Sequence, residues 1–231
     1  MAMFTRRTNL ILLVLLVLSG VLVFYVGMVN KNSRQMTARQ KILKAFYPAL
    51  MGISRIFRGS VKEKSNPASS MPPVSFYSLT AIANDGKEIR FDAWKGRKVL
   101  LVNTASDCGY TAQYADLQRL SEIFKDKLVI IGFPANDFKE QEKGTDEEIG
   151  KFCQLNYGVR FPLAKKSSVV KSPGQNPVFS WLSRKEKNGW NDQQPVWNFS
   201  KYLVNEQGML TYYFDPAVSP LSEEIKSAIG L

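Results

Sequence analysis

The sequence of 231 residues predicts an α/β domain, with a central mixed sheet flanked by helices, preceded by a transmembrane helix. Two observations predict the domain. The buried-strand patterns of residues 98–105 and 128–134 enclose a helical pattern, and a hairpin pattern follows near the C-terminus. Strands that alternate with helices in this way are typical of α/β proteins. A third observation predicts the membrane helix, because residues 10–29 carry no charge.

The N-terminal segment divides into a tail, residues 1–9, and a predicted anchor, residues 10–29. A helix of that length spans roughly 30 Å, the thickness of a bilayer core. A cleaved signal peptide is the alternative, but the apolar run is long and no A-x-A pattern follows it. We therefore expect a single-pass membrane protein. Basic residues after the span favour a cytoplasmic domain, whereas a short tail retained inside gives the opposite orientation, so the side stays open.

Residues 30–73 are predicted to form a basic juxtamembrane segment and a linker. Within it, residues 41–58 mix basic and large apolar side chains. Two interpretations stay open here, an amphipathic segment lying on anionic lipid or a solvated stalk. Pro48 is expected to interrupt any helix in this stretch. Residues 59–73 are rich in Ser, Pro and Lys, which is typical of a linker.

The remaining residues, 74–231, are predicted to form the folded domain. In chain order, the first expected elements are a β-hairpin turning at 84–86, a buried strand at 98–105, a helix at 112–125 and a buried strand at 128–134. A helix follows that begins with a Thr145–Glu148 capping box and ends at Gly158. The last two expected elements are a hairpin turning at 206–208 and a short terminal helix. The strand–helix–strand unit predicts two parallel strands.

Charge and composition exclude several function classes. The first 58 residues hold nine of the 31 basic side chains and no acidic one, so the remaining 173 residues, with 22 basic and 20 acidic side chains, are nearly neutral. Nucleic-acid binding is therefore not expected. The chain contains no histidine and only two cysteines. Serine–histidine catalysis, His-ligated metals and thiolate zinc sites are thereby excluded, and we expect neither a metal nor a cofactor.

One of the cysteines, Cys108, directly follows a buried strand and stands where a helix is predicted to start. The free N–H groups of a helix start favour an anion, so this position lowers the pKa of a thiol and makes it nucleophilic. The neighbouring carboxylate of Asp107 acts in the opposite direction. By itself, a lone cysteine is more often a small buried hydrophobe than a catalytic residue.

Three stretches, VNTASDCGYTAQYADLQRL, GFPANDFKEQEKGTDEEIGKFCQLNYGVRFP and WNFSKYLVNEQG, resemble signature blocks of the glutathione peroxidase family. The resemblance covers residues 74–231 and implies a thioredoxin-like fold and reduction of hydrogen, organic or lipid hydroperoxides. It places the peroxidatic residue at Cys108 and the supporting residues at Gln141, Trp197 and Asn198. Neutral N–H donors of these types stabilise a thiolate and a developing oxyanion, so no histidine is needed.

The second cysteine, Cys153, shares a predicted helix face with Ile149 and Phe152, which alone indicates core packing. The resemblance implies that Cys153 resolves the Cys108 sulfenic acid as a disulfide that thioredoxin reduces. This step requires local unwinding of the helix. The chain departs from the family pattern at Ala135 and Asp137 of FPANDF and at Ala112. The loss of a thiol at Ala135 favours Cys153, and Asp137 adds a charge near Gln141.

The sequence therefore predicts a membrane-anchored thiol peroxidase, monomeric by resemblance to family members of this length, with thioredoxin or glutathione as reductant. A thiol redox relay or peroxide sensor, which passes the disulfide to a partner protein, is the alternative. A catalytically silent scaffold is the third interpretation, and the match of all four site residue types argues against it.

Overall fold

The computed structural model describes residues 2–31, 33, 35–56, 63–66 and 70–230. The N-terminal part contains two helices, α1 (Ala2–Val29) and α2 (Ala38–Ile56). The strands are β1 (Glu63–Ser65), β2 (Thr80–Ile82), β3 (Glu88–Arg90), β4 (Lys98–Thr104), β5 (Leu128–Pro134), β6 (Lys201–Val204) and β7 (Leu210–Phe214). The remaining helices are α3 (Gln113–Ile123), α4 (Asp146–Tyr157), α5 (Pro177–Leu182), α6 (Lys185–Asn188) and α7 (Glu223–Ile229), with 3₁₀ turns at Phe76–Ser78 and Phe91–Trp94.

Every strand and helix predicted for the domain is present. The central sheet has the order β1-β7-β6-β4-β5, in which β4 and β5 are parallel and the other pairs antiparallel. The predicted hairpin of β2 and β3 forms a separate two-stranded sheet. The capping box of Thr145 and Glu148 starts α4, and Gly158, at φ 64°, ends it. A glycine adopts this left-handed conformation without a Cβ penalty.

The structure adds the strand β1, which the sequence did not predict. It lies within the predicted linker and pairs with β7 at the edge of the sheet, with Lys64 opposite Tyr213. Another part of that linker, residues 59–62 and 67–69, lies outside the described residues. The linker prediction therefore misses a short segment that extends the central sheet.

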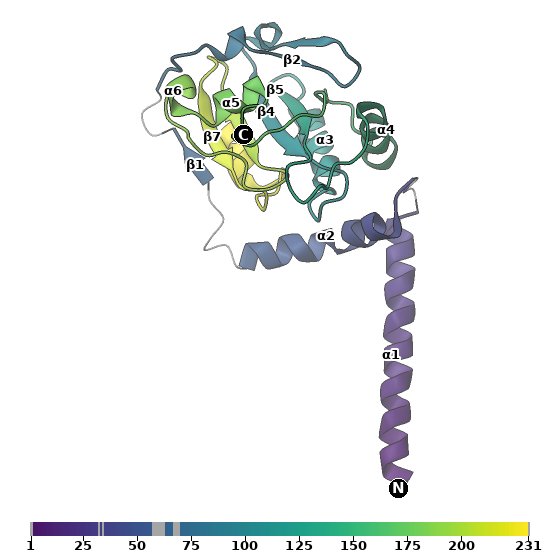
Figure 1. The fold of residues 1–231 in the computed structure, drawn as a ribbon. Coiled ribbons are helices and arrows are strands. Elements are labelled where there is room, and N and C mark those ends of the chain that lie inside the picture. Colours follow the sequence, from purple (N-terminus) through teal and green to yellow (C-terminus); the bar gives the residue numbers. More distant parts are fainter. Residues whose placement is uncertain (1, 32, 34, 57–62, 67–69, 231) are drawn as a thin grey trace.

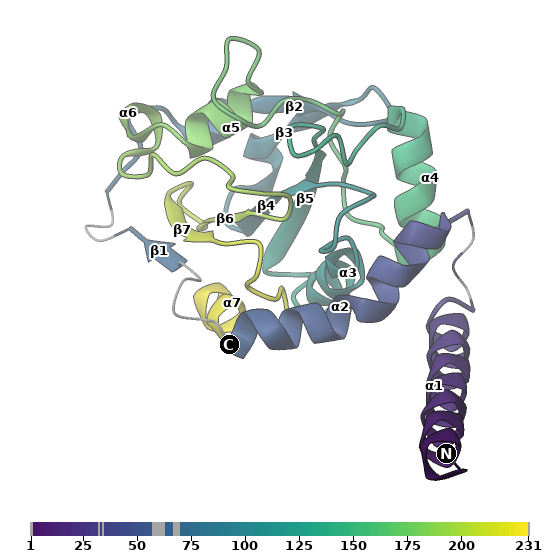
Figure 2. The ribbon, with the colours of Figure 1, turned by 60° about the horizontal axis from the view of Figure 1, so that its bottom comes forward.

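Helices cover both faces of the central sheet (Figures 1 and 2). Along β4, Leu100 and Val102 face one core, which α3, α4 and α7 complete, whereas Val99 and Leu101 face the other, beneath α5 and the β2–β3 hairpin. All four side chains are fully buried. This period-2 alternation with apolar residues on both faces is what a central strand between two helical layers requires.

Strand direction brings three loops to one edge of the sheet. The parallel register pairs Thr104 with Pro134, so the chain leaves β4 and β5 side by side. The antiparallel register pairs Val102 with Lys201, so β6 begins at the same edge. Residues after β4, after β5 and before β6 must therefore meet there, although they are widely separated in sequence.

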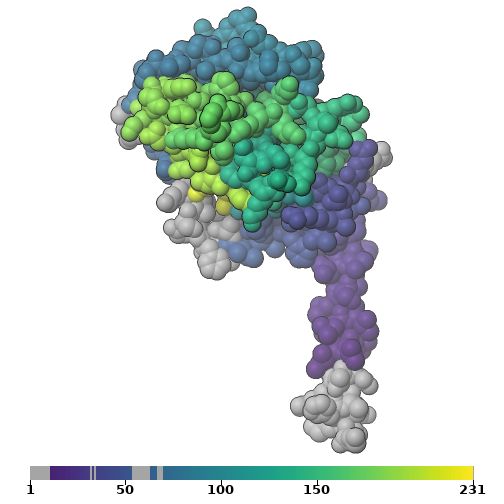
Figure 3. All heavy atoms as spheres, in the orientation of Figure 1, coloured from purple at the N-terminus to yellow at the C-terminus, as the bar shows by residue number. Residues whose placement is uncertain are grey.

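The N-terminal helix α1 projects from the domain as a column (Figures 1 and 3). Its stretch Ile11–Val29 is long and apolar enough to cross a bilayer, which is also true of a signal sequence. The described apolar side chains from Ile11 to Phe24 are exposed. This part of the chain therefore lacks the packing that a core helix would have.

The second helix, α2, lies across the domain beside α3 and α7 and runs transverse to α1 (Figures 1 and 2). The prediction that Pro48 interrupts any helix here is wrong, because α2 continues through it. A proline removes one backbone hydrogen bond. Contacts with the domain support the helix at this point, since Tyr47 donates its hydroxyl to the Asp116 carboxylate of α3 at 2.9 Å.

Candidate active site

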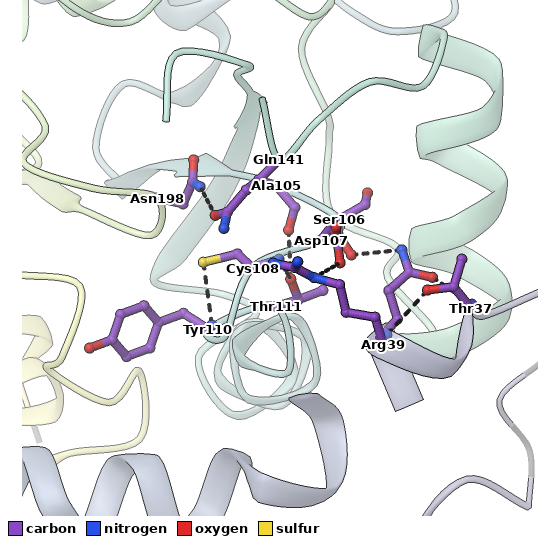
Figure 4. A network of polar contacts seen from close by, with 11 residues as sticks. Thr37, Arg39, Ala105, Ser106, Asp107, Cys108, Tyr110, Thr111, Gln141 and Asn198 are labelled. Carbon is purple, nitrogen blue, oxygen red and sulfur yellow. Dashed lines mark hydrogen bonds and ion pairs between the residues drawn. The ribbon is translucent and has the colours of Figure 1, made fainter. Parts of the chain in front are cut away.

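Cys108 lies in a tight turn between β4 and α3, and this turn has its own hydrogen-bond scaffold (Figure 4). The Cys108 N–H donates to Thr111 Oγ1 at 2.9 Å, and that hydroxyl donates to the Ala105 carbonyl at 2.8 Å. The Asp107 N–H donates to the backbone carbonyl of Gln141 at 3.0 Å. One side chain and one neighbouring loop therefore fix the backbone on both sides of the thiol.

The electrostatic setting of Cys108 differs from the one predicted. Helix α3 begins only at Gln113, and the thiol is 1% exposed, so burial raises its pKa. The Tyr110 N–H donates to the sulfur at 3.4 Å, and the side chains of Trp197 and Asn198 also lower the pKa, whereas the Asp107 carboxylate raises it. The expectation of a pKa lowered by a helix start is wrong, because desolvation outweighs the donors in the resting site.

The structure brings Gln141, Trp197 and Asn198 together with Cys108, each from the loop that strand direction delivers. Gln141 follows β5, and its Oε1 accepts a hydrogen bond from the Asn198 side-chain amide at 2.9 Å (Figure 4). Trp197 packs on Phe138 with ring centroids 5.5 Å apart, and Lys139 Nζ lies 5.7 Å from its ring. Two amides and an indole thus surround a buried sulfur.

The loop that carries Trp197 and Asn198 is fixed by Asn103 of β4. The Asn103 side-chain amide donates to the Trp197 carbonyl at 3.1 Å, and its Oδ1 accepts the Ser200 N–H at 3.0 Å. Phe199 adopts φ 68°, which is uncommon for a residue with a Cβ. Its carbonyl accepts a hydrogen bond from Lys201 Nζ at 2.9 Å. These bonds hold a strained loop in one conformation.

Cys153 lies on α4, in an environment of its own. It is 1% exposed and is a free thiol, as is Cys108. Burial raises the pKa of Cys153 to about 12, with the Glu142 carboxylate acting in the same direction and a hydrogen bond with Tyr114 opposing it. The groups that act on the pKa of Cys108 are other ones, namely Tyr110, Trp197, Asn198 and Asp107. The packing on the face shared with Ile149 and Phe152 is as predicted.

Glu142 is a buried acid that the sequence analysis missed. It is 1% exposed, and its carboxylate accepts a hydrogen bond from Ser106 Oγ at 2.9 Å. Burial raises the pKa of Glu142 to about 7. Its position directly after Gln141 was the available signal. Its charge raises the pKa of Cys153, and it accepts a hydrogen bond from Ser106 on the turn that carries Cys108. Glu142 therefore connects the surroundings of the two thiols.

Asp137, to which the sequence assigned no role, is hydrogen-bonded to a neighbouring loop. Its two carboxylate oxygens accept hydrogen bonds from Ser168 Oγ and from the Val169 N–H, both at 2.8 Å. The carboxylate therefore holds the 168–169 loop.

The fold and the thiol site define the class of an α/β thiol oxidoreductase, and comparisons with known proteins specify it further. The family model for glutathione peroxidase matches residues 76–183. Glutathione peroxidase-like peroxiredoxin 2 of Saccharomyces cerevisiae is 42% identical over 159 residues, which cover 68% of this chain and 98% of the yeast protein. The glutathione peroxidase homolog BsaA of Staphylococcus epidermidis is 39% identical over 156 residues, covering 67% of this chain and 96% of BsaA.

A solved structure, the crystal structure of Trgpx in apo form, aligns with a TM-score of 0.52 at 30% identity and covers 69% of this chain and 97% of that one. The chain therefore belongs to the glutathione peroxidase family. It has a thioredoxin-like fold and is a thiol peroxidase.

Proposed function

We propose that Cys108 is the peroxidatic residue and that Gln141, Trp197 and Asn198 stabilise its thiolate and the leaving oxygen. The observation that carries the proposal is the ring of N–H groups at the sulfur, namely the Tyr110 backbone and the side chains of Trp197 and Asn198. Gln141 orients the Asn198 amide through their 2.9 Å bond. Fixed neutral donors stabilise developing negative charge in a water-poor site without reorganising.

In the first step the Cys108 thiolate attacks the terminal oxygen of a hydroperoxide. An S–O bond forms and the O–O bond breaks, and the departing alkoxide or hydroxide takes up the proton that the Cys108 thiol released, so that alcohol or water leaves. Sulfur loses two electrons and becomes a sulfenic acid, while the peroxide is reduced. The donors at the sulfur are placed to stabilise the departing alkoxide or hydroxide.

In the second step Cys153 resolves the sulfenic acid. Its sulfur attacks the Cys108 sulfur, the hydroxyl leaves as water, and a disulfide forms. A thiol with a pKa of about 12 is almost entirely protonated at neutral pH, so Cys153 is unreactive while it stays buried. The step therefore requires α4 to open locally, which exposes the thiol and returns its pKa toward the ordinary value.

The reductant follows from the number of thiols. An intramolecular disulfide is regenerated by a dithiol protein of the thioredoxin class, whose two thiols supply two electrons through a mixed disulfide. The name of the yeast relative, a peroxiredoxin, is consistent with such a cycle. If Cys153 is only a packing residue, two molecules of glutathione do the same work at Cys108. We favour thioredoxin because the chain contains a second cysteine.

We infer that the N-terminal part anchors this chemistry at a membrane. Residues 1–9 form a tail, 10–29 a single-pass anchor, 30–73 a basic juxtamembrane segment and linker, and 74–231 the peroxidase domain, which acts as a monomer. The side of α2 turned away from the domain exposes Ile42, Phe46 and Ile53. A helix transverse to the anchor and apolar on its outer side suits the bilayer interface. We infer that lipid hydroperoxides are substrates.

One experiment tests the chemistry. The reduced full chain in detergent receives one equivalent of hydrogen peroxide, and its thiols are then alkylated and analysed by mass spectrometry. We expect loss of both thiols and a Cys108–Cys153 cross-linked peptide. Cys153→Ser is the matched control and should stop at a Cys108 sulfenic acid. A wild-type chain that keeps Cys153 free while Cys108 oxidises contradicts the resolving role, and an unoxidised Cys108 contradicts the peroxidatic role.

A second experiment tests the membrane part. The full chain and a chain that starts at residue 31 are compared on phosphatidylcholine hydroperoxide in liposomes and on soluble cumene hydroperoxide. We expect the anchored chain to be faster only on the liposomes. Equal rates on both substrates contradict a role of the anchor in reaching lipid peroxides.

A further inference from the structure

The beginning of α2 touches the turn that carries Cys108 (Figure 4). Arg39 Nε lies 3.1 Å from Asp107 Oδ1, and Gln40 Nε2 donates to the Ser106 carbonyl at 3.0 Å. Ser106 and Asp107 are the two residues that precede the thiol. This contact comes from a part of the chain that precedes the region matched by the glutathione peroxidase family model, residues 76–183.

The geometry of Gln40 is fixed from two sides. Its Oε1 accepts the Thr37 N–H at 2.9 Å, and its own N–H donates to Thr37 Oγ1 at 3.2 Å, which is a capping box at the start of α2. The amide nitrogen of the same side chain is then left to hold the Ser106 carbonyl. One residue therefore both starts the helix and contacts the catalytic turn.

Further contacts hold α2 against the domain beyond this end. Tyr47 donates a hydrogen bond to the Asp116 carboxylate on α3, and Lys44 Nζ lies 5.3 Å from the centre of the Tyr157 ring at the end of α4. A Cβ added at Gly109 would stand 3.3 Å from Leu50 Cδ2, so the helix approaches the turn closely on both sides of Cys108. The position of Arg39 is therefore set by a docked helix.

The start of α2 also lines a partly open cavity next to the site. The cavity has a volume of about 460 Å³, and Thr37 and Gln40 line it together with Gln141, Glu142 and Phe152. It thus lies between the catalytic turn, the loop after β5 and the helix that carries Cys153. Loss of α2 from this place would open the turn to solvent along one side.

Charge gives Arg39 its role. Asp107 disfavours the thiolate of Cys108, as the contribution of Asp107 to the pKa of Cys108 shows. Asp107 Oδ1 is shielded from solvent, and among the described residues it accepts no hydrogen bond. The guanidinium at 3.1 Å therefore opposes its charge. The side chains of Arg39 and Asp107 are 64% and 39% exposed, so the effect is screened and of moderate size.

We propose that α2 forms an additional wall of the peroxidatic site, in which Arg39 and Gln40 are positioning residues that balance the charge of Asp107 and hold the Ser106–Asp107–Cys108 turn. The inference rests on the proposed role of Cys108. It links the membrane-proximal segment directly to the reactivity of the thiol. The chemistry is unchanged, and only the fraction of reactive thiolate and the shape of the turn depend on α2.

Other titratable groups also face this region and must be held constant in the test. Tyr110 on the turn interacts with the thiol, and Asp215 after β7 acts on Tyr110. Glu142, from the loop after β5, interacts with Asp107. Lys139 lies over Trp197. A double-substitution cycle on Arg39 and Asp107 isolates their coupling from these groups.

The experiment uses the full chain in detergent with Cys153→Ser, so that Cys108 is the only thiol. Its alkylation by iodoacetamide is followed against pH for Arg39→Gln, Asp107→Asn and the double variant. We expect Arg39→Gln to slow alkylation at neutral pH about threefold, the size typical of a partly exposed pair. The slowing should shrink to less than half in the Asp107→Asn background and fade at high salt.

Three further variants separate charge from structure. Lys41→Gln removes the same charge from α2 at a residue that forms no ion pair to Asp107, and it should leave the alkylation profile unchanged. Arg39→Lys should restore most of the rate. Gln40→Ala should slow peroxide reduction without moving the alkylation pH profile, since it loosens the turn and leaves the charge in place.

The outcomes are distinguishable. Equal slowing by Arg39→Gln with and without Asp107, or no slowing at all, overturns the charge-balancing role. A Gln40→Ala chain with wild-type peroxide kinetics overturns the positioning role. Alkylation is measured without peroxide, so a chain with the expected profile that consumes no peroxide refutes the proposed function and leaves the coupling of Arg39 to Cys108 intact.

Discussion

The side-chain amide of Asn198 donates to Gln141 Oε1 at 2.9 Å, which joins the loop before β6 to the loop after β5 at the sulfur of Cys108. The two residues are 57 positions apart in the sequence. Their contact exists because β6 begins at the edge of the sheet where β5 ends. The donors of the site therefore act as one unit.

We predict that Asn198→Asp slows peroxide reduction at neutral pH by about a hundredfold. A carboxylate cannot donate a hydrogen bond to Gln141, and its negative charge disfavours the thiolate beside it. The expected loss is of the size seen when one donor to a developing oxyanion is removed. Stopped-flow measurement of the second-order rate with hydrogen peroxide checks this. Asn205→Asp is the matched control, because Asn205 Oδ1 only accepts hydrogen bonds, from the N–H groups of Gln207 and Met209. A similar loss in both variants would contradict the role of Asn198.

Cys153→Ser is expected to abolish turnover with thioredoxin while the first equivalent of peroxide is still reduced at the wild-type rate. The reason is that Cys108 reacts without Cys153, and only the disulfide step is lost. Coupled oxidation of NADPH through thioredoxin reductase measures turnover, and a single-turnover assay measures the first step. Cys108→Ser should abolish both. Undiminished thioredoxin turnover in Cys153→Ser would contradict the resolving mechanism.

Glu142 makes the stability of the fold depend on pH. Its pKa is raised from 4.5 in the unfolded chain to about 7 in the folded one. Below pH 4.5 the carboxyl is protonated in both states and does not destabilise the fold. As pH rises from 4.5 through 7 the unfolded chain ionises more readily than the folded one, so the free energy of unfolding falls. Glu142→Gln should therefore stabilise the protein at pH 8 by about 1–3 kcal/mol, and by much less at pH 4. Urea unfolding at the two pH values measures this.

Glu140→Gln is the control for that prediction. Glu140 is exposed and pairs with the exposed Lys143, an interaction that contributes little to stability. This variant should change stability equally little at both pH values. A Glu142→Gln variant with the same small, pH-independent effect would show that the carboxyl is solvated in the fold and that its pKa is not raised.

Lys201 gives the opposite pH trend. The side chain is fully buried, and burial lowers its pKa from 10.5 to about 7. A lowered lysine pKa costs stability below 7, and the cost disappears as pH rises from about 7 through 10.5. The stability of wild type relative to Lys201→Met should therefore increase between pH 7 and pH 10, as chemical denaturation at each pH measures. A difference that stays flat over that range contradicts the lowered pKa.

Local patterns in the sequence were enough for most strands and helices of the domain, although they did not predict β1, α5 or α6. The apolar runs of 99–102 and 128–134 specify strands buried on both faces, and Thr145 with Glu148 specifies where α4 starts, because these signals depend only on neighbouring residues. The motifs around Cys108, Gln141 and Trp197–Asn198 likewise predicted the family. That prediction needed the residue types and their order, which the chain carries directly.

Only the tertiary structure decided the electrostatics and the long-range contacts. Burial raises the pKa of Cys108, against the expectation from its place before a helix, since desolvation depends on everything packed around the thiol. Helix α2 continues through Pro48 and brings Arg39 to Asp107, a contact across 68 positions of sequence. Local sequence indicates only that a proline disfavours a helix and that a helix start favours a thiolate. Whether α2 continues and whether the pKa of Cys108 is lowered depend on packing and solvent exclusion, which come from residues that the fold brings together.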